Sequence, residues 1–250
     1  MPKLTILGTA TNIPDEHHEN THMVLVSKQR MVLIDGPGNP YSRMKQASLK
    51  VDRLTDIIMT HFHPDHVSGI PLLLMALGLS GRTEAMNIYA NTHCLKYMKE
   101  LLVNFEWENW HSFHVNFIEL PEEELFLALE DEEFQIFTSP VKHFVPALGL
   151  RVVFKETGKI LAYSGDTALT ESLYTLAHQA DVLIHEAAGE SMGHCSARQA
   201  GTVAKSAGVG KLFLVHYPVG DFNYQSLVQE AGETFDGPIV MAEDFDELDF

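Results

Sequence analysis

The sequence contains few of the features that mark secreted or membrane proteins. It has only two cysteines, Cys94 and Cys195, in 250 residues, which is not the cysteine density of a secreted disulfide framework. Its richest apolar stretch, residues 69–79, is too short to span a bilayer, and the chain does not begin with a charged leader followed by a long apolar region. These absences predict a cytoplasmic protein with no membrane partner.

Positive charge is also scarce. The chain has 17 lysines and arginines against 34 aspartates and glutamates, a formal net charge of -17. Thirteen of the acids lie in residues 119–133 and 241–250, which contain no lysine or arginine, and we expect a solvated acidic loop and a solvated tail there. The rest of the chain contains 21 aspartates and glutamates and 17 lysines and arginines. The charge therefore gives no support to a nucleic-acid partner, because phosphate binding depends on lysine and arginine, but does not exclude one.

Short apolar runs that predict strands recur along the chain, and longer runs that predict helices lie between several of them. The composition, 45% hydrophobic and 20% charged, is that of a globular domain. The predicted strands span residues 4–7, 23–26, 31–34, 56–59, 87–90, 134–137, 150–154, 160–163, 182–184, 212–215 and 239–241. The predicted helices span residues 67–77, 92–103, 171–178, 196–207 and 224–233, the fourth with Ser196 as its N-cap and Gly208 at its end.

Both halves of the chain follow one plan, several antiparallel strands and then strand–helix units, with the acidic stretch between them. This arrangement predicts a single domain, residues 1–250, of two similar halves at about 1–118 and 134–250. The expected fold class is α/β, with two packed sheets and helices on the outside.

Residues of metal-ligand type cluster after one predicted strand. The segment THFHPDHVSG, residues 60–69, places three histidines and an aspartate within six positions, and single residues of the same types follow later strands. Imidazole and carboxylate are the ligands that zinc and similar divalent metals take, and strand ends hold such groups rigidly. The set suits two ions that share a carboxylate and a hydroxide. Its members are His61, His63, Asp65, His66, His143, Asp166 and His216.

The segment at residues 60–69 resembles the defining motif of the metallo-β-lactamase superfamily, and the resemblance extends over nearly the whole chain. It implies a four-layer αβ/βα sandwich with two divalent metal ions at one edge of the sheets. Zinc is the expected metal, and manganese or iron are the alternatives. Asp35, after the strand at residues 31–34, matches an early aspartate that supports a metal-bound histidine from behind. The resemblance implies that one ion is bound by His61, His63 and His143, and the other by Asp65, His66 and His216, with Asp166 bridging.

Two further segments resemble ribonuclease Z and its phosphodiesterase relatives. They are LIHEAA at residues 183–188 and GHCS at residues 193–196, and residues 4–10 and 163–167 resemble the same branch. This resemblance implies a phosphodiesterase with a metal-bridging hydroxide as nucleophile and with Asp65 in the catalytic site. His194 would then be the general acid, with Glu186 as the carboxylate that orients its ring. For His194 and Glu186 the alternative is a structural role, as a buried ion pair that holds a loop against the sheet.

The sequence also departs from the ribonuclease Z pattern. The segment after the early aspartate reads DGPGNP, without the Gly-Glu-Gly-Thr-Gln that is typical of the family, and the 23 positions from His143 to Asp166 leave no room for an RNA-clamping arm. We therefore expect an ester or phosphodiester substrate, without support for transfer RNA. A lactone, thioester or other carboxylic ester hydrolase and a non-enzymatic metal-dependent binding module stay open as alternatives, as does a homodimer, since relatives are often dimers.

Overall fold

The computed structural model describes residues 1–110, 113–220 and 223–250. Their strands form two seven-stranded sheets. The first sheet has the order β14-β1-β2-β3-β4-β5-β6, with the strands β14 (Glu247–Asp249), β1 (Lys3–Gly8), β2 (His22–Val26), β3 (Met31–Ile34), β4 (Asp56–Ile58), β5 (Met86–Ala90) and β6 (Val115–Glu119). The second has the order β13-β12-β11-β10-β9-β8-β7, with the strands β13 (Ile239–Met241), β12 (Lys211–Val215), β11 (Val182–Glu186), β10 (Ile160–Tyr163), β9 (Ala147–Phe154), β8 (Phe134–Val141) and β7 (Phe126–Glu130).

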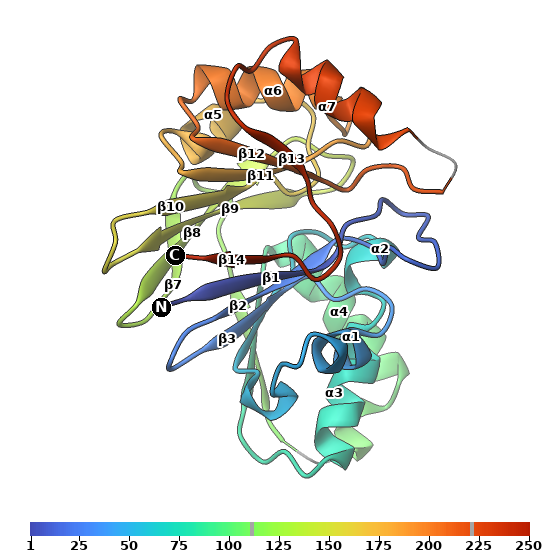
Figure 1. The fold of residues 1–250 in the computed structure, drawn as a ribbon. Coiled ribbons are helices and arrows are strands. Elements are labelled where there is room, and N and C mark those ends of the chain that lie inside the picture. Colours follow the sequence, from blue (N-terminus) through green and yellow to red (C-terminus); the bar gives the residue numbers. More distant parts are fainter. Residues whose placement is uncertain (111–112, 221–222) are drawn as a thin grey trace.

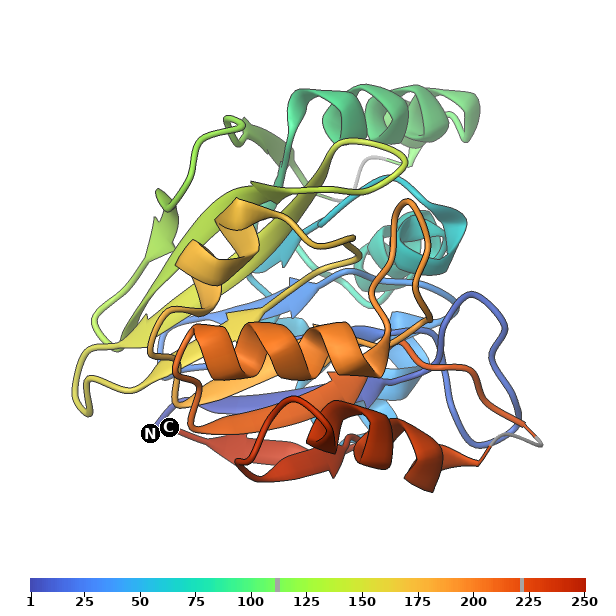
Figure 2. The same ribbon diagram turned by 90° about the horizontal axis from the view of Figure 1, so that it is seen from above.

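Helices cover the outer face of each sheet, so the molecule has four layers (Figures 1 and 2). None of the helices in the described residues is both long and apolar enough to cross a bilayer. The layer order confirms the predicted α/β sandwich. The first sheet carries α1 (Pro40–Gln46), η1 (Val51–Arg53), α2 (Pro64–Val67), α3 (Ile70–Leu79), α4 (Thr92–Asn104) and η2 (Trp107–Asn109), and the second carries α5 (Glu171–Ala177), α6 (Ala197–Ser206) and α7 (Tyr224–Gly232).

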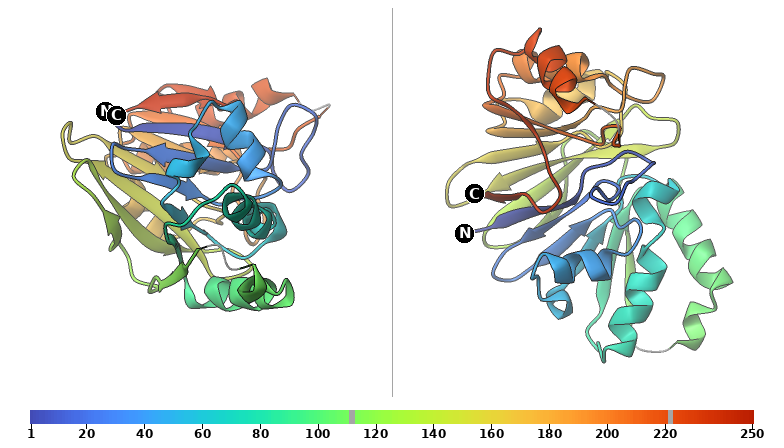
Figure 3. Two further views of the ribbon diagram at one scale, coloured as in Figure 1. Left: turned by 90° about the horizontal axis from the view of Figure 1, so that it is seen from below. Right: turned by 45° about the vertical axis from the view of Figure 1, so that its right-hand side comes forward.

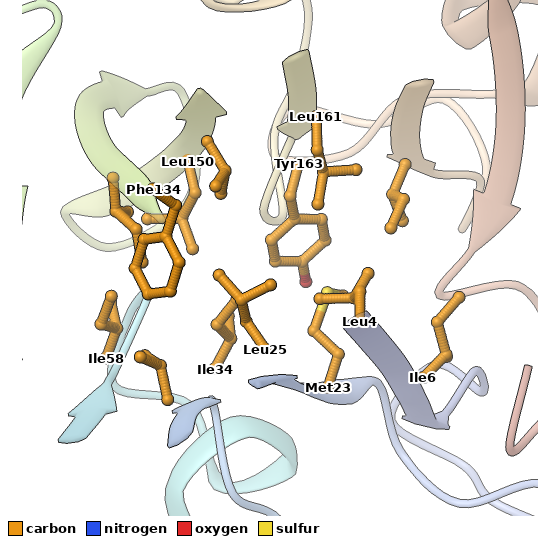
Figure 4. Close-up of a cluster of buried hydrophobic side chains, with 14 of the residues drawn as sticks. Leu4, Ile6, Met23, Leu25, Ile34, Ile58, Phe134, Leu150, Leu161 and Tyr163 are labelled. Carbon is orange, nitrogen blue, oxygen red and sulfur yellow. The ribbon is translucent and has the colours of Figure 1, made fainter. Parts of the chain in front are cut away.

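The main core lies between the two sheets. Figure 4 shows Leu25 and Ile34 of the first sheet facing Phe134, Leu150 and Tyr163 of the second, and all five side chains are buried. Burial of one such side chain contributes about 1.5–3 kcal/mol relative to exposure. Two further clusters fill the space between each sheet and its own helices. The sheets are therefore held face to face by the side chains that alternate inward along each strand.

The two sheets have the same strand plan. Strands β1, β2 and β3 are antiparallel and β3 to β6 are parallel, while β7 to β10 are antiparallel and β10 to β13 are parallel. The carboxyl ends of parallel strands meet at one edge of a sheet, which is where open α/β sheets bind their ligands. In this molecule both edges lie on the side where α2 projects (Figure 1; Figure 3, right).

Every predicted strand and helix overlaps an observed one. Ser196 and Gln199 form a capping box at the start of α6, and Gly208, with φ of 69°, lies just past its end, as the sequence predicts. The elements α1, β6, β7 and β14 lie outside the predicted segments. Within the described residues, β7 and β14 are edge strands that pair with β8 and β1, respectively.

Most acidic side chains of the two acidic stretches are exposed, as we expected, but the backbone is not simply a loop and a tail. The first contains β7, which pairs with β8, and the second contains β14, which pairs with β1 in the register Lys3↔Asp249. Within the second stretch, Asp244 accepts hydrogen bonds from the Thr9 hydroxyl and from Arg43, and Phe250 is only 3% exposed. The sequence therefore predicted the exposure of most acids and missed the two strands, because strand pairing depends on remote partners.

Candidate metal centre

Three histidines from two sheets form the first group of potential ligands. His61 and His63 follow β4, and His143 follows β8. The His63 Nδ1 atom lies 3.1 Å from His61 Nε2 and 3.1 Å from His143 Nε2. One nitrogen of each ring thus lies within 4.8 Å of the other two, a spacing at which a single cation can contact all three.

Two carboxylates and two imidazoles form the second group. The Asp166 Oδ2 atom lies 3.4 Å from His66 Nε2 and 3.3 Å from His216 Nε2. The Asp65 Oδ2 atom lies 3.6 Å and 3.5 Å from the same two nitrogens. Asp166 Oδ2 is also 3.9 Å from His61 Nε2 of the first group. Asp166 therefore lies between the two groups, where a bridging ligand would have to be.

The other ring nitrogens fix the orientation of the histidines. His66 Nδ1 lies 2.9 Å from Asp35 Oδ2, and His143 Nδ1 donates to the Gly193 carbonyl at 2.7 Å. Asp35 also accepts the Thr60 amide at 2.7 Å and the Thr60 hydroxyl at 2.8 Å, which leaves the hydroxyl oxygen to accept from His61 Nδ1 at 3.1 Å. Because Nδ1 is occupied in all three rings, Nε2 faces the site.

Two of the site residues have left-handed backbone conformations. Asp35 has φ of 59° and His216 has φ of 51°, and each directly follows a strand, β3 or β12. A non-glycine residue in this region costs of order 1–3 kcal/mol and persists only where its surroundings hold it there. Both side chains contact other site residues, Asp35 with His66 and His216 with Asp166.

The electrostatics of the site favour a cation. Burial lowers the pKa of His61 well below its usual range and that of His143 to about 4, so both rings are neutral near pH 7 and able to act as ligands. Burial also disfavours a charged His66, but the Asp166 and Asp35 carboxylates outweigh it and raise the pKa of His66 well above its usual value. The carboxylates of the site therefore attract positive charge.

Unpartnered buried atoms point to the same conclusion. His66 Nε2 and Asp166 Oδ1 are buried and have no hydrogen-bond partner within the described part of the chain. Buried polar atoms without partners are costly, and coordination of a metal ion would satisfy both. The residues present therefore fit divalent metal ions.

His194 and Glu186 lie beside the two groups. Glu186 ends β11, and its Oε1 atom is 3.0 Å from His194 Nδ1. The Glu186 carboxylate also accepts the backbone amides of Thr167 at 2.8 Å and Ala188 at 3.1 Å. Burial lowers the pKa of His194, but the hydrogen bond and the charge of Glu186 outweigh it and raise that pKa. Glu186 therefore both orients the His194 ring and holds the loop that carries it.

A cavity of about 500 Å³ opens onto this arrangement. Its lining comes from α2 and from loops that follow strands of both sheets. The described residues that line it are Thr11, Asn12, Ile13, His63, Asp65, Phe144, Asp166, Ala188, His194, His216 and Pro218.

The structure brings together all ten site residues that the sequence singles out, which are His61, His63, Asp65, His66, His143, Asp166, His216, Asp35, Glu186 and His194. Sequence reasoning missed Thr60, the Gly193 carbonyl and the apolar wall of the cavity. Thr60 directly precedes the histidine motif, so its position was a usable signal. Nothing in the local sequence marks Ile13 or Phe144, because only tertiary packing brings them to the cavity.

Comparison with protein families identifies the fold. A model described as the Beta-lactamase superfamily domain matches residues 30–217. The chain belongs to this superfamily. The match confirms the superfamily that the motif at residues 60–69 predicts, and with it the sandwich fold.

Individual relatives agree with the superfamily assignment. Ribonuclease Z of Methanothermobacter thermautotrophicus is 25% identical over 295 residues, which cover 94% of this chain and 92% of the relative. Among solved structures, the metallo-β-lactamase fold protein YhfI from Bacillus subtilis has a TM-score of 0.85 at 22% identity, covering 99% of this chain and 98% of that one. The short form of human tRNase Z has a TM-score of 0.79 at 25% identity with the same coverage. Two of these three relatives are named ribonuclease Z or tRNase Z, the group that the GHCS and LIHEAA segments resemble.

Proposed function

We propose that this protein is a dinuclear metal-dependent phosphodiesterase in which His194 acts as the general acid. The observation that carries the proposal is the arrangement of His194 and Glu186, 3.0 Å apart, beside two adjoining groups of metal-ligand side chains. Relatives named ribonuclease Z and tRNase Z, at 25% identity over most of their length, support phosphodiester bonds as the target.

The two groups would hold one divalent ion each. One ion is assigned to His61, His63 and His143, the other to Asp65, His66 and His216, with Asp166 between them. Nitrogen and carboxylate donors of this kind suit zinc, and manganese or iron are the alternatives. Paired divalent ions supply a lowered pKa for water and charge neutralisation for a scissile phosphate. The protein holds the ligands in place through Asp35, Thr60 and the Gly193 carbonyl.

His194 is placed to move a proton. Its Nδ1 atom is engaged by Glu186, so transfer to a leaving oxygen runs through Nε2, and the residue lines the cavity. General acid catalysis by a positioned side chain contributes typically about 10²–10⁴ in rate. Glu186 keeps the ring in one orientation and favours its protonated form. Since Glu186 also anchors the Thr167 and Ala188 amides, a purely structural ion pair is the competing interpretation.

A His194→Ala variant separates the two interpretations. Wild type and variant are loaded with zinc or manganese and assayed on two phosphodiesters, one with an alkoxide leaving group and one with p-nitrophenolate. A general acid matters for the basic alkoxide and little for p-nitrophenolate, so we expect a loss of about 10²–10⁴ on the first and a much smaller loss on the second. Metal content should be unchanged.

The control is His178→Ala, because His178 is an exposed histidine at the end of α5. Equal losses of His194→Ala on both substrates would contradict the acid role, and loss of metal would make His194 a ligand. A lactone and a thioester are assayed in parallel. If the wild type hydrolysed these and neither phosphodiester, the protein would be a carboxylic ester hydrolase that uses the same ligands.

A further inference from the structure

Two exposed apolar side chains stand at the mouth of the catalytic cavity. Phe144 is 57% exposed and Ile13 is 74% exposed, and both line the cavity together with His63, Asp65 and His194. Ile13 belongs to the loop after β1 and Phe144 to the loop after β8. Apolar groups that remain exposed next to a site with polar ligands mark a surface for part of a substrate.

The Phe144 ring is held in place rather than free. Its centroid lies 5.2 Å from that of His143 and 5.9 Å from that of His194. A Cβ atom at Gly193 would lie 2.6 Å from the Phe144 ring, so only glycine lets the loop approach this closely. From the other sheet, the Asn91 side-chain amide donates to the Pro146 carbonyl at 2.9 Å. A ring fixed in advance loses little conformational entropy when a ligand stacks on it.

The loops around the cavity do not suit a long polyanion. The loop residues 9–21, 142–146, 187–195 and 216–220 contain a single lysine or arginine, Lys142, against four acids, Asp15, Glu16, Glu19 and Glu190. Binding of an RNA strand depends on lysine and arginine at its phosphates. Between His143 and Asp166 the chain forms only the antiparallel pair β9 and β10, which leaves no arm to supply such residues.

We propose that the substrate is a singly charged phosphodiester of nucleotide size, with a planar aromatic group such as a nucleobase that stacks on Phe144. This inference rests on the proposed phosphodiesterase activity. A cavity of about 500 Å³ lies in the range typical of small-molecule sites. The phosphate would lie at the metal ligands and the base against the Phe144 ring, so Phe144 determines specificity and takes no part in proton transfer.

The test compares two substrates that differ only in the base. They are the methyl ester of thymidine 5′-phosphate and its abasic analogue with 1,2-dideoxyribose, both followed by mass spectrometry with zinc-loaded protein. Base–aromatic stacking predicts that the base raises kcat/KM by about 5- to 150-fold. In Phe144→Ala this ratio should fall close to one, and in Phe144→Leu it should be intermediate. Because Phe144 is largely exposed, the variants should keep the wild-type Tm and zinc content.

Phe105→Ala is the matched control, since Phe105 is a 48% exposed phenylalanine at the end of α4 that is not part of the cavity lining. It should retain the wild-type ratio. Equal rates on the two esters, or an unchanged ratio in Phe144→Ala, would overturn the stacking role and leave the phosphodiesterase proposal standing. A strong preference for a thymidine decanucleotide that weakens with salt would show a polyanion site instead. Hydrolysis of no phosphodiester at all would refute both proposals.

Discussion

The two halves of the molecule supply the proposed metal ligands in different ways. The first half provides four from one short segment, His61, His63, Asp65 and His66, all directly after β4. The second half provides one from each of three separate loops, which follow β8, β10 and β12. Since the sheets share the same strand plan, the difference lies in the loops. A site on this scaffold therefore needs only strand ends that meet at one edge. The number of ligands that follow each strand can differ.

This division has consequences for how each half holds its ligands. In the first half, Pro64 starts α2 and Asp35 binds both Thr60 and His66, so local structure fixes the motif. In the second half each ligand depends on the packing of its own loop, as with His216, which has φ of 51°. Variants in the second half therefore test tertiary placement, and variants around Asp35 test local support.

The largest effect is expected for Asp166→Asn, because Asp166 lies between the two ligand groups. The variant should lose more than about 10³ in kcat, since charge stabilisation by paired metals is worth several kcal/mol. Elemental analysis should show less than the wild-type metal content. Asp244→Asn is the control, a buried aspartate that contacts Arg43 outside the site, and it should keep both metal content and kcat. Full activity of Asp166→Asn would show that the second half does not supply a bridging ligand.

A smaller effect is expected for Asp35→Asn, which weakens the support behind His66. Removal of such a partner typically lowers metal affinity about 10- to 100-fold, to be measured by competition with a chelator. Asp56→Asn is a matched control, because Asp56 is a fully buried aspartate of the same half that binds Arg30 and Asn87. It should lower stability without changing metal affinity. If both variants lost the same amount of metal, the loss would follow from the lower stability of the fold and not from the missing contact between Asp35 and His66.

Within the described residues, each half also contains one buried histidine outside the proposed ligand set. Burial lowers the pKa of His22 on β2 and of His185 on β11 to about 4, and each donates its Nδ1 proton to a backbone carbonyl. A folded-state pKa below the unfolded value of 6.5 stabilises the fold above pH 6.5, and this contribution is lost as pH falls from 6.5 towards 4.

When the pH falls from 7.5 to 5, each of these histidines should lower the free energy of unfolding by about 2 kcal/mol. His22→Gln and His185→Gln should each reduce this acid-dependent loss by that amount in urea titrations at the two pH values. A loss identical to that of the wild type would show that neither ring is kept neutral in the fold.

The smallest effect is expected at the junction of the halves. Asn91 caps α4 by accepting the Cys94 amide and also donates to Pro146 beside the His143 loop, whereas Asn39 caps α1 without contacting that loop. Asn91→Ala and Asn39→Ala should both lose about 1 kcal/mol for the cap, measured by urea unfolding. Only Asn91→Ala should also lower kcat, by less than about tenfold. Equal kinetics in both variants would show that the His143 loop does not depend on the first half.

The sequence by itself determined most of the elements and the candidate ligand set. Apolar runs and caps predict the paired strands and the main helices, and the density of ligand types at residues 60–69 predicts the metal site, because these signals arise from neighbours along the chain. For His143, Asp166 and His216 the only signal in the sequence is that each residue follows a predicted strand.

Tertiary structure decided the rest. It alone placed β14 beside β1, buried the side chains of Asp244 and His22, and brought Ile13, Phe144 and Asn91 to the site, because contacts between residues that are distant in the sequence leave no periodic trace in either segment. It also set the left-handed backbone at Asp35 and His216, where packing of the surrounding chain imposes a conformation that the residue type does not favour.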